Sequence, residues 1–309
     1  MTLPDGFHEL ARELRNWGRW GADDERGTLN LLTDEVVRRG VGDVRTGQRL
    51  TLAMPLDDQG PQAGLVPGRD NPVHTVTMLH HAFDGDPDHY AASDDAIDMS
   101  LQAATHWDAL AHVSYGGHLY NGFPAGTVTA KGASRCGIDK VGALVGPGLL
   151  LDVARARGVE RLTPGHTITP DDLDAAVELA RTEVRPGDLL LLRTGQVRSF
   201  LDDGDRVAYA YPSAGPGMEA ARWFREHDVA AVATDTLVFE VFPCERDGLF
   251  LPVHLLDLVE IGLTQGQNFV LEELAVACAE DDRYRFLLDA SPQRITGGLG
   301  SPVTPVAIR

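Results

Sequence analysis

Leu189-Leu190-Leu191-Leu192, which follows the turn residue Gly187, is the stretch that decides the fold class. Four consecutive leucines after a glycine predict a short strand that is buried on both faces. Leu149 to Val153 is a second compact apolar run, and Val229 to Thr234 is a third. Short apolar runs that return at such intervals are typical of a buried sheet whose strands are joined by helices.

Helices are predicted between and beyond these strands. Thr169 is suited to the N-cap of a helix whose first turn contains Pro170, and Thr33 is suited to cap an earlier helix. Gly217 to His227 and Glu272 to Cys278 also have helical patterns. The second half of the chain therefore alternates helix and strand, which predicts an α/β fold.

The first half has more loops. Gln48 to Met54 and Val73 to Phe83 are predicted strands, and 56–72 and 84–95 are turn-rich. No repeat, low-complexity tract or linker divides the sequence, so we predict a single domain over 1–309.

Composition excludes several classes of protein. The 309 residues carry a formal net charge of −19, which argues against binding to nucleic-acid backbones or anionic membranes. The three cysteines are widely spaced, which suggests neither a disulfide framework nor a thiolate zinc site. The N-terminus lacks the apolar stretch of a signal peptide, and no apolar run reaches the roughly 18 residues of a membrane span. We predict a cytoplasmic protein.

The strongest chemical signal is Thr105-His106-Trp107-Asp108-Ala109-Leu110-Ala111-His112. On an extended backbone His106 and Asp108 project from the same side, and a helical turn would bring His112 towards Asp108. Imidazole and carboxylate groups at this spacing can share a divalent metal. The pattern alone is equally compatible with a structural role.

Other polar residues have weaker claims. His74, His80 and His81 lie on a predicted strand, and structural roles are favoured for them. Asp235 and Glu240 could form a ligand shell or hold local backbone, and we favour the second role. No glycine-rich phosphate loop is present.

Several motifs together resemble the cyclase-like metal-dependent hydrolases, a family that includes bacterial kynurenine formamidases and isatin hydrolases. The segment from Gln102 to His112 is similar to that family's H-x-G-T-H-x-D-x-P-x-H. Further matching segments follow in the family's order, from residue 14 to residue 308 approximately: Asn16-Trp17-Gly18-Arg19-Trp20, Gly27-Thr28-Leu29-Asn30, Thr234-Asp235 with Glu240, Leu251-Pro252-Val253-His254, Gly266-Gln267-Asn268-Phe269 and Gly300-Ser301-Pro302-Val303.

The resemblance implies a role for each matching residue. His106 and Asp108 match metal ligands, His112 matches an acid–base histidine, and His254 matches a further histidine of the site. Gln102 falls where the family usually has a ligand histidine, and Gln267 where many members have a ligand glutamate. A neutral amide is a weaker donor, so we expect one divalent ion, manganese or zinc, rather than two. A site that works without any metal is the alternative.

Aromatic and polar residues beside the motif are the candidates for substrate binding, with core packing as the alternative for each aromatic residue. They are Trp107, Tyr115, His118, Tyr120, Asn121 and Trp20.

The resemblance also implies a fold and an assembly. The fold is a swivelling β/β/α architecture with a central mixed, barrel-like sheet flanked by helices. The assembly is a homodimer or homotetramer, with a loop-rich N-terminal segment of about residues 1–50 able to contact a partner subunit.

Three functions fit these observations. The first is metal-assisted hydrolysis of a cyclic or aryl amide or ester (a lactam, lactone or formanilide), by a metal-activated water with His112 as acid and base. The second is a lyase, dehydratase or cyclase of specialised metabolism that uses the same pocket with weak or no metal. The third is a non-catalytic ligand-binding protein, against which His106, Asp108 and His112 together argue.

Overall fold

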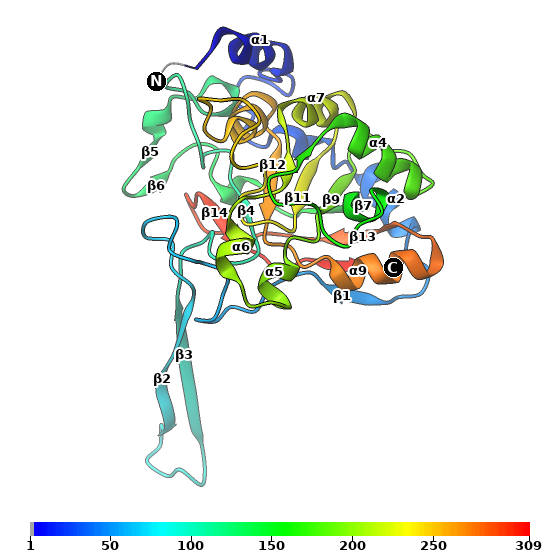
Figure 1. The fold of residues 1–309 in the computed structure, drawn as a ribbon. Coiled ribbons are helices and arrows are strands. Elements are labelled where there is room, and N and C mark those ends of the chain that lie inside the picture. Colours follow the sequence, from blue (N-terminus) through cyan, green and yellow to red (C-terminus); the bar gives the residue numbers. More distant parts are fainter. Residues whose placement is uncertain (1–2) are drawn as a thin grey trace.

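A nine-stranded mixed sheet organises the molecule, a computed structural model that describes residues 3–309 (Figure 1). The strand order is β1-β15-β13-β7-β9-β11-β12-β4-β14. The four central strands, β7 to β12 in that order, run parallel, and antiparallel strands extend the sheet on both sides. The strands are β1 Arg49–Thr51, β4 His106–Asp108, β7 Val145–Asp152, β9 Leu189–Arg193, β11 Ala231–Thr234, β12 Thr264–Gln267, β13 Arg285–Asp289, β14 Gly300–Pro302 and β15 Val306–Ile308.

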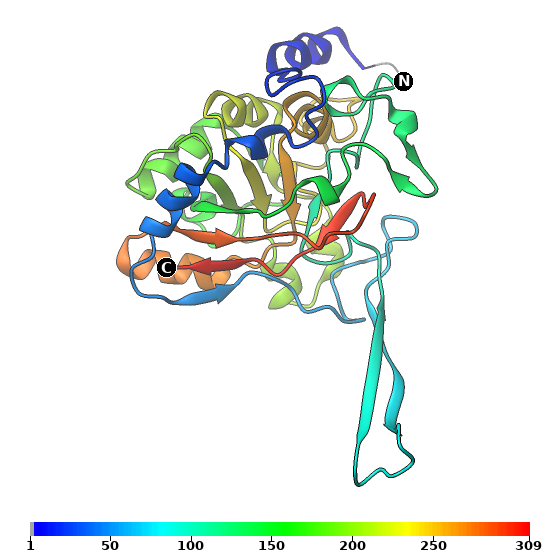
Figure 2. The same cartoon turned by 180° about the vertical axis from the view of Figure 1, so that it is seen from behind.

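Helices cover both faces of this sheet. α4 and α7 lie on one face, and α2 lies on the other against β7 and β13 (Figures 1 and 2). The helices are α1 Asp5–Leu14, α2 Asp34–Gly42, α3 Val153–Ala156, α4 Pro170–Leu179, α5 Arg198–Leu201, α6 Arg206–Ala210, α7 Met218–Glu226, α8 Pro252–His254 and α9 Glu272–Asp281. Short 3₁₀ segments are η1 Gly27–Leu31, η2 Tyr120–Gly122, η3 Ala125–Thr127 and η4 Ile138–Lys140, and η5 Leu255–Ile261 is a π-helix.

The central strands are buried because both of their faces meet other elements. All five residues of β9 are buried, as are seven of the eight in β7. This double burial is the reason why Leu189 to Leu192 reads as a continuous apolar run rather than an alternating one. The predicted α/β class and the central mixed sheet flanked by helices are confirmed.

Local expectations are met at the helix starts. Thr169 and Asp172 form a capping box at α4, and the Thr33 side chain accepts a hydrogen bond from the Val36 amide at α2. Two stretches differ. The turn-rich stretch 84–95 contains the start of β3, and the N-terminal segment, expected to be loop-rich, contains α1, η1 and α2. Within the described residues, no helix is long and apolar enough to cross a membrane.

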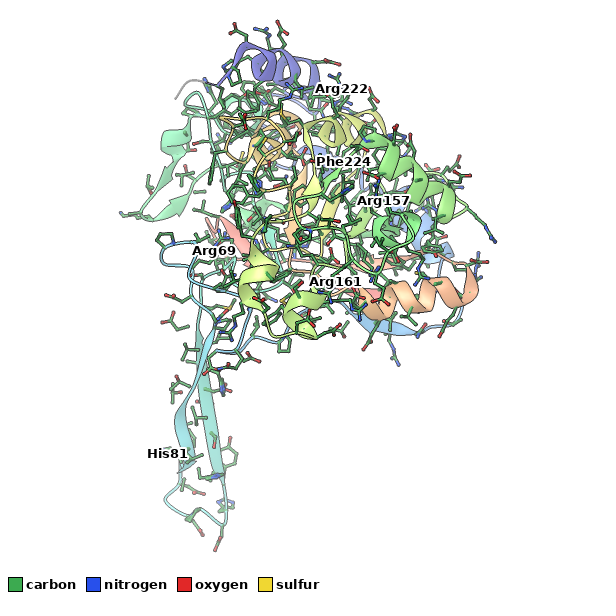
Figure 3. The ribbon with its side chains drawn as sticks, viewed as in Figure 1. Arg69, His81, Arg157, Arg161, Arg222 and Phe224 are labelled. Carbon is green, nitrogen blue, oxygen red and sulfur yellow. The ribbon has the colours of Figure 1, made fainter. Side chains whose placement is uncertain are left out.

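A long hairpin extends away from the sheet (Figures 1 and 2). It pairs β2 (Val73–Ala82) with β3 (Ala91–Asp98), and nearly all of its residues are exposed. His81 lies towards its outer end (Figure 3). The histidines of this hairpin, His74, His80 and His81, are therefore solvent-facing, and His74 pairs with Asp95. Several large apolar side chains are exposed on the hairpin as well: Val73, Val76, Leu79, Phe83, Tyr90 and Ile97.

Successive side chains of β4 point to opposite faces of the sheet. Trp107 points into the core, where its ring meets Phe269 edge-on at 5.2 Å between centroids and its indole N–H donates to the Ala290 carbonyl. The residue opposite Trp107 on β12 is Gly266. A Cβ atom at Gly266 would lie 2.7 Å from the Trp107 ring and 2.8 Å from Phe269. The glycine is thus required by the close approach of the indole.

We expect Gly266→Ala to lower the free energy of unfolding by about 1–3 kcal/mol, because the added methyl group overpacks the contact with Trp107. Gly126→Ala is the matched control, since a Cβ there meets nothing within 4 Å. Urea unfolding of both variants measures the difference. Equal stability of the two variants would show that the indole can move aside at no cost.

Candidate active site

Three side chains meet on the face of β4 opposite Trp107. His106 and Asp108 project from this face, and Gln267 lies directly across from His106 on β12. The Gln267 amide donates to Asp108 Oδ2 at 2.6 Å. His106 Nε2 lies 3.5 Å from Asp108 Oδ1, and His112 Nε2 lies 3.7 Å from the same oxygen. The structure therefore brings together four of the predicted site residues.

The hydrogen bonding of His106 fixes the role of its ring. Its Nδ1 lies 2.8 Å from the carbonyl oxygen of Ala104, which can only accept, so Nδ1 carries the proton. In the neutral ring, Nε2 is then a free acceptor. That atom is buried and has no hydrogen-bond partner, and the same is true of Asp108 Oδ1. Two acceptors thus face one another across 3.5 Å.

The surroundings keep Asp108 ionised. Burial opposes the charge, but His112, His106 and His254 hold the pKa of Asp108 well below its usual range. A permanently charged carboxylate beside a lone pair of His106 needs a cation between them or a proton on the ring. A divalent cation held by both groups would satisfy this arrangement.

His112 follows β4 after a tight turn, in which its amide donates to the Ala109 carbonyl. Its side chain is 21% exposed, whereas those of His106 and Asp108 are almost fully buried. Burial lowers the pKa of His112, with His254 and Arg69 adding to the shift and Asp108 opposing it. A neutral, accessible imidazole beside a carboxylate is suited to accept a proton from a bound molecule.

His254 is positioned by Glu240. The Glu240 carboxylate accepts hydrogen bonds from the His254 ring at 2.5 Å, from the His254 amide and from the Val253 amide. Burial works against the imidazolium, but Glu240 and Asp108 raise the pKa of His254 overall. His254 lies close enough to the cluster for its charge to lower the pKa of both Asp108 and His112. The surroundings thus favour the neutral form of His112 and the charged form of His254.

Asp235, the other acidic residue of this region, holds backbone instead. Its carboxylate accepts hydrogen bonds from the Thr194 amide and hydroxyl and from the Gly195 amide. This is the structural role favoured for it from the sequence.

The residues present fit a single metal ion better than two. His106 Nε2 and Asp108 Oδ1 supply two unpartnered donors, and the Gln267 amide lies alongside. Gln102 is near as well, because a Cβ on Gly300, the β14 partner of Asp108, would lie 2.5 Å from the Gln102 amide nitrogen. Among the described residues, no group of three His, Cys, Asp or Glu side chains is arranged to hold a metal. The remaining ligands would have to be amide oxygens or water.

The predicted substrate contacts separate into two other places. Trp107 is in the core, 1% exposed, and we no longer propose it as a substrate contact. Tyr115 donates to Glu260, and Tyr120 donates to Asp24 at 2.9 Å. Asn121 donates to three carbonyl groups of the N-terminal segment and accepts from the Gly18 amide. Tyr120 and Asn121 therefore fasten the N-terminal segment, whereas Tyr115 binds Glu260 of η5.

His118 and Trp20 lie in the same neighbourhood. His118 meets Trp17 edge-on at 6.0 Å between ring centroids, and Arg19 stacks over the Trp20 ring. A small cavity of about 60 Å³ is lined by Tyr115, His118 and Trp17, among others. No hydrogen bond within residues 3–309 connects this group to the His106 cluster.

Arg69 is a site residue that the sequence did not indicate. Its guanidinium lies close enough to act electrostatically on Asp108 and His112. Figure 3 shows Arg69 beside β4 and β14. The sequence offered no signal, since a lone arginine in a loop rich in glycine and proline does not reveal where that loop folds.

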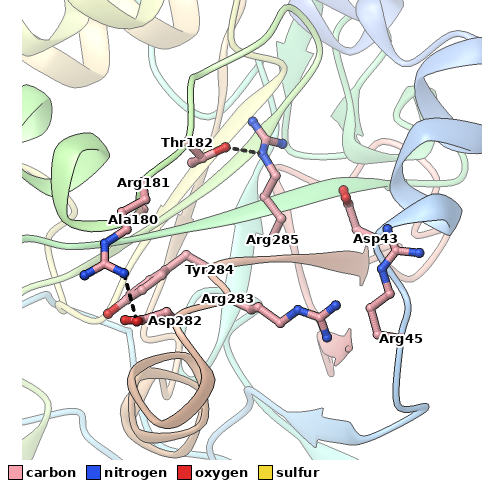
Figure 4. Close-up of a pocket in the computed structure, with 9 residues that line it drawn as sticks. All are labelled: Asp43, Arg45, Ala180, Arg181, Thr182, Asp282, Arg283, Tyr284 and Arg285. Carbon is pink, nitrogen blue, oxygen red and sulfur yellow. Dashed lines mark hydrogen bonds and ion pairs between the residues drawn. The ribbon is translucent and has the colours of Figure 1, made fainter.

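A separate hollow of about 210 Å³ lies near the start of β13 (Figure 4). Arginines and aspartates line it together, and Arg181 pairs with Asp282 while Arg285 donates to the Thr182 hydroxyl. It contains no histidine.

The geometry defines an α/β protein with a histidine–carboxylate cluster at one end of a curled mixed sheet. The model of the putative cyclase family matches residues 50–241. The crystal structure of a novel cyclase is 37% identical, with a TM-score of 0.88, over 97% of this chain and 99% of that one. The chain therefore belongs to the putative cyclase family.

More distant structures share the fold. Isatin hydrolase A from Labrenzia aggregata, bound to benzyl benzoate, is 22% identical with a TM-score of 0.61, over 86% of this chain and 94% of that one. A potential metal-dependent hydrolase with cyclase activity is 19% identical with a TM-score of 0.52, over 85% and 98%. No curated protein matches the chain.

One buried acid near the site has a consequence for stability. Asp257 lies in the π-helix η5, where Gln265 donates to its Oδ2. Burial raises the pKa of the Asp257 carboxyl to about 8. Because this value lies above the unfolded one, the folded state holds the proton over a pH range in which the unfolded state has lost it.

Stability should therefore fall as pH rises from about 4 to about 8, by on the order of 1 kcal/mol per pH unit from this group. Asp257→Asn has no proton to lose, so we expect its unfolding free energy to depend less steeply on pH. Urea unfolding at pH values of about 5 and about 7.5 measures the slope, with the exposed Asp247→Asn as control. An unchanged slope in Asp257→Asn would assign the titration to another group.

Proposed function

We propose that this protein is a metal-assisted hydrolase of a cyclic or aryl amide or ester, of the lactam, lactone or formanilide type. The observation that carries the proposal is the pair of buried, unpartnered acceptors, His106 Nε2 and Asp108 Oδ1, 3.5 Å apart. The names of the similar structures, isatin hydrolase and metal-dependent hydrolase, support the same reaction class.

In this proposal His106 and Asp108 hold one divalent ion, manganese or zinc, with Gln267 or Gln102 contributing an amide oxygen. Such an ion supplies Lewis acidity, which polarises a carbonyl group and makes water more acidic. Because Gln267 donates to Asp108, its amide would have to rotate to offer oxygen instead. A neutral amide in place of a carboxylate at Gln267, and a weaker donor in place of an imidazole at Gln102, argue for one ion rather than two.

The histidines provide the proton transfers. His112, kept neutral, takes a proton from the attacking water and returns it to the leaving nitrogen or oxygen. His254, kept cationic by Glu240, is suited to donate a hydrogen bond to negative charge that develops on the carbonyl oxygen. The lowered pKa of His112 and the raised pKa of His254 support this division of work.

A lyase, dehydratase or cyclase that works with weak or no metal is the second candidate. The observation that favours it is the hydrogen bond from Gln267 to Asp108, which occupies one carboxylate oxygen and brings no charge to the site. His112 and His254 would then act as base and acid for an elimination or a ring closure.

Two further expectations stay predictions: a cytoplasmic location, and assembly into a homodimer or homotetramer. The hairpin of β2 and β3 is the part of the chain that assembly would stabilise most. It exposes apolar side chains such as Leu79, 69% exposed, and Phe83, 61% exposed, and a lone two-stranded hairpin is only marginally stable in water.

Metal content tests the hydrolase proposal directly. We expect purified protein to contain about one transition-metal ion per chain, and His106→Ala and Asp108→Asn to weaken metal binding at least roughly 100-fold, since even the loss of a supporting partner costs 10- to 100-fold. Elemental analysis and metal titration measure this, with the exposed His8→Ala as control. Full activity in metal-free protein would favour the second candidate.

His112→Gln tests the proton transfer. We expect kcat on a panel of lactams, lactones and formanilides to fall by roughly 10²- to 10⁴-fold, because the general base is lost while the metal ligands remain. Bound metal and folding should match the unsubstituted protein by elemental analysis and circular dichroism. Unchanged kcat with metal in place would remove His112 from the mechanism.

A further inference from the structure

We infer that Arg69 anchors an anionic group of the substrate, and that the natural substrate therefore carries a carboxylate near the bond that is cleaved. The inference rests on the proposed function, because it names the substrate class of the same site. It depends on three observations: where the loop holds Arg69, what surrounds its guanidinium, and which charges remain near it.

The loop that carries Arg69 is fastened to the segment leading into β4. The Gln62 side chain donates to the Ala103 carbonyl at 2.6 Å, and the Ser100 hydroxyl donates to the Gly68 carbonyl at 2.9 Å. The amide of Arg69 itself closes a turn onto the Val66 carbonyl. Residues 100–105 run directly into His106, so the position of Arg69 is coupled to the catalytic strand (Figure 3).

The guanidinium of Arg69 has no partner among the described residues. It is half-buried, yet no hydrogen bond or ion pair of its side chain is present within residues 3–309. Two other arginines that are at least partly buried are paired: Arg193 contacts Asp152 and Glu272, and Arg285 contacts Asp188. A partly desolvated cation without a counter-ion is costly, which is consistent with a site that a ligand completes.

The nearby charges leave Arg69 available. The chain has 46 acidic residues and a net charge of −19. Burial lowers the pKa of Arg69, and among residues 3–309 Asp108 is the carboxylate whose charge opposes that shift. Neither oxygen of Asp108 is hydrogen-bonded to Arg69: Oδ2 accepts from Gln267, and Oδ1, which has no hydrogen-bond partner, lies 3.5 Å from His106 Nε2 and 3.7 Å from His112 Nε2. In so acidic a protein, a guanidinium near the cluster that pairs with no carboxylate of residues 3–309 is able to bind an anionic ligand.

A carboxylate is the anion that this arrangement fits. The planar guanidinium presents parallel N–H donors that match the two oxygens of a carboxylate. A carboxylate held there would place the attached ring or chain towards His112 and the His106–Asp108 pair. It would also explain how an acidic protein binds an acidic substrate, because the local positive charge offsets the general repulsion.

The test uses two matched ligands that need no turnover, 2-aminobenzoate and its neutral isostere 2-aminobenzamide. By isothermal titration calorimetry, the unsubstituted protein should bind the benzoate roughly 10- to 100-fold more tightly than the benzamide. Arg69→Met should remove this preference, and Arg69→Lys should retain part of it. Arg38→Met, at an exposed position of α2, should behave like the unsubstituted protein.

Equal affinity for the two ligands in the unsubstituted protein would overturn the inference, as would an equal loss for both ligands in Arg69→Met. Circular dichroism confirms the folding of each variant, and Arg69→Lys provides the comparison if Arg69→Met unfolds.

Turnover separates this inference from the proposed function. The pair 2-formamidobenzoate and formanilide share the scissile formamide and differ only in the carboxylate. A preference for 2-formamidobenzoate that appears in KM and disappears in Arg69→Met supports the inference. Hydrolysis of both compounds at rates independent of Arg69 keeps the proposed function and overturns the inference. Arg69-dependent binding of 2-aminobenzoate without hydrolysis of either formamide keeps the inference and overturns the function for formanilides.

Discussion

The pairing of β4 on both of its edges is the constraint on which the site depends. This strand has only three residues, yet β12 binds it on one side and β14 on the other. Backbone hydrogen bonds fix its rotation, so alternate side chains must face opposite ways. His106 and Asp108 consequently share one face, and Trp107 is directed into the core. A shift of the strand by a single residue would exchange the two faces and place the Trp107 indole on the face that now carries His106 and Asp108.

The site also depends on how buried charge is distributed. Asp108, Glu240 and Asp257 are completely buried, and each would be expensive in isolation. The structure handles each one differently: Asp108 stays ionised among histidines, Glu240 accepts from a histidine ring and two amides, and Asp257 favours its protonated form. Neighbouring groups with opposite protonation preferences are what acid–base chemistry needs at one pH.

The sequence predicted most accurately those features of the structure that a single local segment determines. The leucines of β9 and the cap at Thr169 could be recognised because burial on both faces and helix starts leave local patterns. The cluster of His106, Asp108 and His112 could be recognised from its spacing, and the family resemblance added Gln267 and a role for His254.

What the sequence missed depends on contacts between distant segments. Trp107 was equally compatible with a pocket or a core until Gly266 and Phe269 were placed against it. Tyr120 and Asn121 suggested substrate contacts because they lie near the motif, but their partners are in the N-terminal segment, about 100 residues away in sequence. Arg69 belongs to a loop whose path is set by Gln62 and Ser100, and no periodicity records such a path.

The alternation along β4 has a consequence for how this fold changes over evolutionary time. On one face of the strand Trp107 packs in the core, and on the other face lie His106 and Asp108 of the candidate site. The indole contacts Phe269 and Ala290, whereas Gln267 contacts Asp108, so a substitution at Gln267 removes none of these contacts of the indole. A lineage can therefore exchange donors, lose an ion or adopt a different reaction without first having to find a new way to fold.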